Sequence, residues 1–99
     1  MSEEWGFAAP AFKVDEALAR LRRDLREAGL VERGGVFERR ATAIAKVAAG
    51  VGVVEAAIVD RPSRRAPTWR ARQLTSGADV RDFVTLVKKQ LGAWSQDDE

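Results

Sequence analysis

The segment 13–28 carries hydrophobic residues at the spacing of an amphipathic α-helix. Five of them recur at alternating steps of four and three residues, and so share one helical face: Val14, Leu18, Leu21, Leu25 and Ala28. Gly29 follows, and glycine readily takes the left-handed conformation that ends a helix. Leu30 then stands where a Schellman cap would pack it against Leu25. We therefore predict a helix over 13–28.

A second helical pattern occupies 76–94. Its apolar residues again fall on one face: Val80, Phe83, Val84, Val87, Leu91 and Trp94. Ser76 can cap the first turn, and Asp79 three residues later completes a capping box with aspartate in place of glutamate. We predict that this helix ends near residue 94.

The middle of the chain, 36–59, alternates apolar and polar residues in the manner of strands. A turn at Gly50 would fold it into a hairpin, in a register that sets Lys46 beside Glu55 as a favourable cross-strand pair. The alternative is a helix over 38–49, because alanine is abundant there and favours helices. We favour strands, since valine, isoleucine and threonine are frequent in this segment.

A further strand is predicted over 68–75, after a proline-containing loop over 60–67. Alternation along a strand puts Trp69 on one face and Arg70 and Arg72 on the other. We expect the tryptophan in the core and the two arginines on the solvent-facing side of the sheet.

These elements predict an α+β fold with the order helix, three or four antiparallel strands, helix, and with both helices packed on one face of the sheet. One domain would span 13–95, preceded by an arm over 1–12 and followed by an acidic tail over 96–99 that frays. The arm carries three aromatic residues that either fold back onto the core or form a docking peptide for another protein: Trp5, Phe7 and Phe12.

The charges are unevenly distributed along the 99 residues. The net charge is +2, but five acids lie near the two ends, and residues 5–96 carry 17 basic and 10 acidic side chains, a net charge of +7. Arginine outnumbers lysine by 13 to 4, which hints at a GC-rich, bacterial genome. No apolar run approaches the roughly 20 residues of a membrane span, and the acidic N-terminus does not resemble a signal peptide. We expect a cytoplasmic protein with no membrane partner.

The composition argues against catalysis. Histidine, cysteine and tyrosine are absent, which removes the usual general base near neutral pH, the thiolate nucleophile and most transition-metal ligands. The glycine pairs are too short for a phosphate-binding loop. We expect no enzyme activity, no catalytic residues, no cofactor and no metal site.

The stretch 61–73 contains five arginines, one tryptophan and no acid. Guanidinium groups suit phosphate oxygens, and this stretch predicts a site for nucleic acid, either DNA or RNA. The candidate binding residues are Arg61, Arg64, Arg65, Arg70 and Arg72, with Arg39 and Arg40 if the strand order brings them near.

The order helix, strands, helix is similar in topology to that of double-stranded-RNA-binding domains. The similarity ends at topology, because the second helix begins Ser76-Gly77-Ala78-Asp79 without a lysine cluster, and no histidine is present for the first hairpin loop. We assign no binding residue from this similarity.

A protein-interaction or homodimerisation module is the alternative function. A sheet with one bare face and open edges can complete its burial against a second protein, through the open face or through an edge. The apolar residues expected on that open face are Ile44, Val53, Ala57 and Val59.

Overall fold

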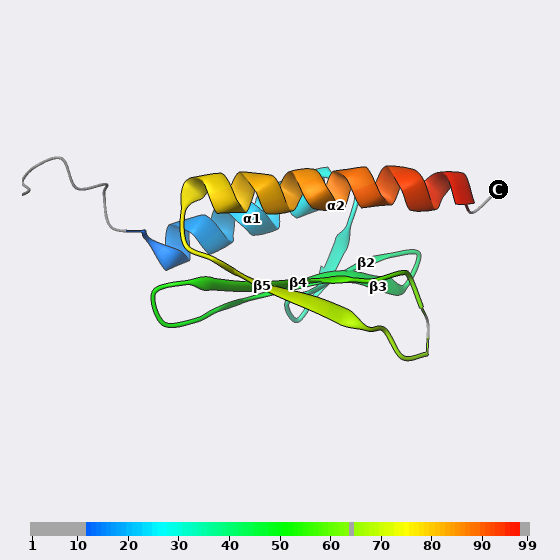
Figure 1. Cartoon of the computed structure of the whole chain (residues 1–99), viewed down its shortest axis with the longest axis horizontal. Helices are drawn as coiled ribbons and strands as arrows, with labels where there is room; N and C mark the ends of the chain where they lie inside the picture. The colour runs from blue at the N-terminus through cyan, green and yellow to red at the C-terminus, as the bar shows by residue number, and fades with distance from the viewer. Residues whose placement is uncertain (1–11, 64, 98–99) are drawn as a thin grey trace, which may run out of the picture.

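The computed structural model describes residues 12–63 and 65–97. The elements in chain order are α1 (Val14–Glu27), β1 (Val31–Arg33), β2 (Val36–Arg39), β3 (Thr42–Ala49), β4 (Val54–Val59), β5 (Trp69–Leu74) and α2 (Gly77–Asp97). The strands form one antiparallel sheet in the order β1-β2-β3-β4-β5, and both helices lie over the same face of it (Figure 1). The predicted α+β class is confirmed, and the sheet has five strands rather than three or four.

α1 forms as its hydrophobic spacing predicts. Leu21 and Leu25 are fully buried, and the remaining residues of the apolar stripe pack against the core. Gly29 has a φ of 101°, the Gly29 amide donates to the Arg26 carbonyl, and the Leu30 amide donates to the Leu25 carbonyl. These two bonds are the Schellman motif, and they satisfy carbonyls that would otherwise be left without a partner at the helix end.

α2 begins with the predicted cap. The Asp79 amide donates to the Ser76 hydroxyl at 3.1 Å, and all six predicted core residues of this helix are buried. The helix continues to Asp97 and is three residues longer than its apolar pattern predicts. No proline and no left-handed glycine follows Trp94, so nothing in the sequence stops the helix there.

The first hairpin was missed by the hydrophobic pattern. β1 is only three residues long and pairs with β2 across Gly34 and Gly35, whose φ values are 57° and 87°. Two positive φ values in a two-residue loop define a type I′ turn, for which a glycine pair is a strong signal. No strand is predicted before residue 36, because a strand of three residues shows no periodicity.

Residues 42–49 are a strand, which resolves the helix-or-strand alternative. The β3–β4 turn is longer than predicted, with the Gly50 amide donating to the Val53 carbonyl, so the register differs by two residues. Lys46 lies opposite Ala57, and Glu55 lies opposite Ala48. A two-residue difference keeps the side chains that are paired between β3 and β4 on their predicted faces.

The core lies between the helices and one face of the sheet. Phe37 and Phe83 are its largest fully buried side chains. Ile44, expected on the open face, is buried instead, because a register shift between β2 and β3 leaves it as an extra residue beside Ala45.

The arm is described only at its last residue. Phe12 is partly buried against the core, as one of the two interpretations predicts, whereas Trp5 and Phe7 lie outside the described residues. In the part of the chain that the structure describes, neither helix is long and apolar enough to cross a membrane.

Candidate nucleic-acid interface

The arginine-rich loop connects β4 to β5. The Asp60 amide donates to the Thr68 carbonyl at 2.8 Å and closes the base of the loop. Within the loop, the Ser63 hydroxyl accepts hydrogen bonds from the amides of Arg65 and Ala66. These two bonds connect the backbone of Arg65 and Ala66 to the side chain of Ser63 within the loop.

Arg61 and Arg65 are the exposed cations of this loop. Within the described residues, neither guanidinium has an ion pair or a hydrogen bond. Arg64 lies outside the described residues. The loop therefore presents at least two positive charges that no carboxylate of the described chain neutralises.

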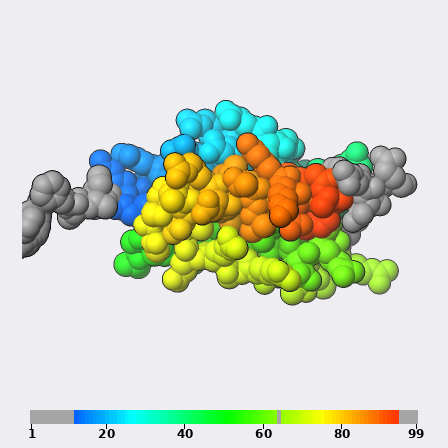
Figure 2. All heavy atoms as spheres, turned by 45° about the horizontal axis from the view of Figure 1, so that its top comes forward, coloured from blue at the N-terminus to red at the C-terminus, as the bar shows by residue number. Residues whose placement is uncertain are grey.

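The two arginines of β5 lie on the opposite face from the one predicted. Arg70 pairs with Ile58 and Arg72 with Ala56, and these partners belong to the face that the helices cover. Trp69 and the two arginines lie on opposite faces, as predicted, but each lies on the face predicted for the other. Leu74 indicates the correct face, because it alternates onto the same face as Arg70 and Arg72 and is buried. β5 is an edge strand and lies along the side of α2 (Figure 2). Arg70 and Arg72 both remain exposed.

A small groove separates β5 from α2. It has a volume of about 120 Å³, and its lining includes Arg70, Arg72, Leu86 and Gln90. The Arg70 Nη2 atom lies 2.7 Å from the Asp60 Oδ1 atom in an exposed ion pair. The candidate interface therefore contains an acid, Asp60, that pairs with Arg70. The sequence alone does not predict this pair, because it depends on the register between β4 and β5.

Trp69 lies on the open face of the sheet, not in the helix-covered core where we expected it. Its side chain is half-buried and packs against the edge of the core, and the Lys46 ammonium lies 4.5 Å from the centroid of the indole ring. This distance is typical of a cation–π contact. Side chains alternate between the two faces of a strand. Because Arg70, Arg72 and Leu74 occupy the helix-covered face of β5, Trp69 faces the open side.

Arg39 and Arg40 lie at the β2–β3 turn. Antiparallel strands in sequential order reverse at every connection, so this turn is at the same end of the sheet as the β4–β5 loop. Arg39 also donates from Nη1 to the Leu91 carbonyl of α2 at 3.4 Å. The strand order thus gathers four of the predicted residues at one end of the molecule: Arg39, Arg40, Arg61 and Arg65. Arg70 lies next to this group and Arg72 lies further along β5.

The arginines of α1 and β1 are compensated by acids. On α1, β1 and β2, ion pairs with nitrogen–oxygen distances of 3.0 to 3.9 Å join Arg20–Asp24, Arg22–Glu32, Arg26–Glu32 and Arg33–Glu38. The positive charge is therefore neutralised internally along α1 and β1. Among the described residues, Arg61 and Arg65 of the β4–β5 loop have no ion pair, and neither do Arg81, Lys88 and Lys89 of α2.

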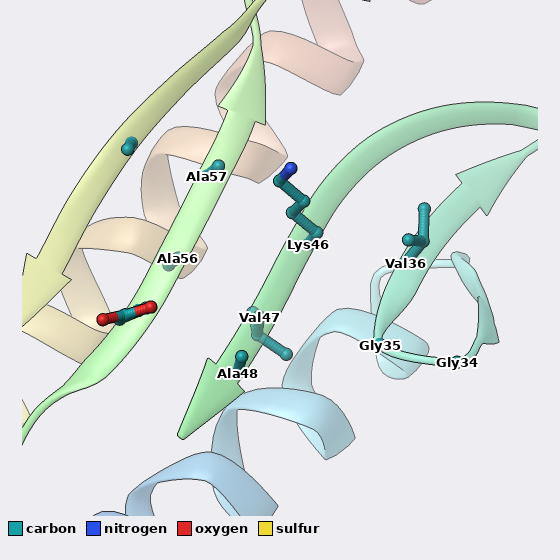
Figure 3. Close-up of a pocket in the computed structure, with 10 residues that line it drawn as sticks. Gly34, Gly35, Val36, Lys46, Val47, Ala48, Ala56 and Ala57 are labelled. Carbon is teal, nitrogen blue, oxygen red and sulfur yellow. The ribbon is translucent and has the colours of Figure 1, made fainter. Parts of the chain in front are cut away.

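A hollow of about 330 Å³ marks the open face of the sheet (Figure 3). Its lining is mainly glycine, alanine and valine, with two charged side chains, Lys46 and Glu55. Figure 3 views it from the side away from the helices, whose ribbons lie behind the strands. This surface is apolar and distinct from the arginine-rich end.

No group of three or more potential ligands that could hold a metal ion occurs among the described residues. The fold defines a small α+β domain with an antiparallel five-stranded sheet. Comparison of the chain with protein-family models, with curated proteins and with solved structures gave no match.

Proposed function

We propose that this chain is a non-catalytic, cytoplasmic domain that binds nucleic acid through the phosphate backbone. The contacts would come from the β4–β5 loop, from β5 and from the β2–β3 turn: Arg61, Arg64, Arg65, Arg70, Arg72, Arg39 and Arg40. The observation that carries the proposal is the asymmetry of charge compensation, since the Arg61 and Arg65 guanidiniums have no acid partner while those of α1 do.

The ion pair between Arg70 and Asp60 is compatible with this role. Both side chains are exposed, with accessible fractions of 73% and 42%. Exposed ion pairs contribute about 0–1 kcal/mol, so a phosphate can replace the Asp60 carboxylate at low cost. A guanidinium donates two parallel hydrogen bonds to phosphate, and each phosphate neutralised releases bound counterions, which makes the affinity depend steeply on salt.

The proposal is tested by an electrophoretic shift assay with single- and double-stranded DNA and RNA over a range of salt concentrations. The triple substitution R61Q/R65Q/R70Q should weaken binding for every sequence. It should also reduce the slope of log affinity against log salt by about one for each lost phosphate contact.

The matched control is R20Q/R23Q/R81Q, which also removes three positive charges, but from exposed positions on the two helices. Its affinity should stay close to that of the wild type. If the wild-type protein shifts none of the four nucleic acids at low salt, or if the two triple variants lose equal affinity, the proposed interface is wrong.

Association with another protein through the open sheet face is the second candidate function. The observation in its favour is the apolar hollow on that face, together with the exposed edge of β5. The outward face of a solvated antiparallel sheet is ordinarily polar, whereas the lining of this hollow is mainly glycine, alanine and valine.

A further inference from the structure

The open face carries its charges in an unusual arrangement. Lys46 on β3 lies opposite Ala57 on β4, and the next outward-facing pair is Ala48 opposite Glu55. The four positions therefore form a rectangle with the two opposite charges on one diagonal and the two alanines on the other.

The two charges are not paired with each other. The Lys46 ammonium lies over the Trp69 ring, and Glu55 makes no ion pair or hydrogen bond within the described residues. An acid and a base therefore stand on the rim of an apolar hollow, with the acid lacking a partner.

We propose that a second copy of this chain covers the open face, with Lys46 of each copy against Glu55 of the other. The inference rests on the second candidate function, association through this face, and names its partner. A two-fold axis between the two sheets, close to the line from Ala48 to Ala57, brings each charge near the opposite charge of the other copy.

The self-complementary charges identify a second copy rather than a different protein. A two-fold interface presents the same patch on both sides, so it needs a patch that matches itself after rotation. One acid and one base placed symmetrically about an apolar line meet this requirement. Alanines on the axis let two sheets approach to about the 10 Å of sheet-on-sheet packing, and each hollow leaves room for the long charged side chains of the other copy.

The experiment is sedimentation of wild type, K46E and E55K between about 5 µM and about 500 µM, a range that brackets the Kd of a small interface. The wild type should dimerise. Each single variant places two like-charge contacts across its own interface, and its Kd for dimerisation should rise at least about tenfold.

A mixture of K46E and E55K should restore the dimer, because glutamate at position 46 and Glu55 of one variant then face lysine at position 55 and Lys46 of the other. This gain of association cannot result from misfolding. The control mixture is K88E with E27K, which reverses charges on the helices, away from the open face. Each of these two variants should dimerise alone as the wild type does.

A wild type that remains monomeric at the highest concentration overturns both this inference and association with itself. A dimer that persists in K46E and in E55K overturns the inference alone, since association then uses another surface. Nucleic-acid binding is measured separately with the arginine variants, so neither result decides it.

Discussion

The Asp79 carboxylate holds together the turn that precedes α2. Its Oδ2 atom accepts hydrogen bonds of 3.0 Å from both the amide and the hydroxyl of Thr75. The bond from the backbone amide, together with the hydroxyl bond and the nearby charge of Arg72, lowers the pKa of Asp79 below its usual value. These bonds favour the ionised form in the folded state.

A lowered pKa makes the contribution of Asp79 to stability dependent on pH. The contribution is present above the pKa of the unfolded chain and is lost as the pH falls through the lower, folded value. We expect D79N to be less stable than the wild type at neutral pH, and the difference to shrink in acid. Urea unfolding of both proteins from about pH 7 to about pH 2 measures it.

The control for this experiment is D82N, because Asp82 is exposed one turn further along α2. Its difference from the wild type should change less with pH than that of D79N. A D79N difference that stays constant, or grows, in acid would show that the Thr75 bonds do not depend on the ionised carboxylate.

Asp60 has the opposite role, as an acid within the proposed interface. Removing its charge with D60N should change the free energy of unfolding by less than about 1 kcal/mol, because the pair with Arg70 is exposed. The same change should strengthen nucleic-acid binding, since Arg70 no longer has to leave a carboxylate. Weaker binding by D60N at unchanged stability would count against contact between Arg70 and phosphate.

Among the structural elements, the β2–β3 hairpin holds local strain. Its two turn residues, Arg40 and Ala41, have φ values of 53° and 63°. Left-handed backbone costs a residue with a Cβ atom about 1–2 kcal/mol, whereas glycine takes it freely. We expect A41G to raise the free energy of unfolding by about 1 kcal/mol.

The same substitution in a helix should have the opposite effect. A19G, at an exposed position within α1, should lower the free energy of unfolding by about 1 kcal/mol, because glycine disfavours helix. Thermal or urea unfolding of both variants provides the comparison. If A41G is destabilising as well, the turn is not strained in solution.

The elements differ in how far the sequence predicts them. Both helices, the cap at Ser76 and the Schellman end at Gly29 follow from local spacing, because the residues that define them are neighbours in the chain. The register at Gly50 depends on which turn closes the hairpin, and two registers bury the same apolar residues. β1 is too short for periodicity, so only its glycine turn could have indicated it.

The faces of β5 illustrate what requires the whole sheet. Alternation separates Trp69 from Arg70, but it does not say which face the helices cover, and at an edge strand both faces reach solvent. The hydrophobic size of tryptophan suggested the core, whereas Leu74 at the end of the strand decides the matter. The arginine content of the β4–β5 loop and of β5 can be read from the sequence, but the face on which Arg70 and Arg72 lie and the position of the Asp60 carboxylate cannot.

At the scale of the whole molecule, two surfaces of different character lie on different sides. The arginine-rich end combines the β4–β5 loop, β5 and the β2–β3 turn, and its charge is only partly compensated. The hollow on the open sheet face is lined mainly by apolar residues, with one acid and one base among them. A dimer through the open face would leave the arginine-rich end of each copy accessible, so the two proposals are compatible and are tested by different variants.

Amide chemical shifts in a ¹H–¹⁵N NMR titration with a short duplex measure the location of the phosphate contacts most directly. We expect the largest shifts at residues 60–72 and at Arg39 and Arg40, with α1 nearly unchanged, and we expect them to reverse on addition of salt. Shifts centred on α1, or no shifts at low salt, would contradict the assignment of this surface to nucleic acid.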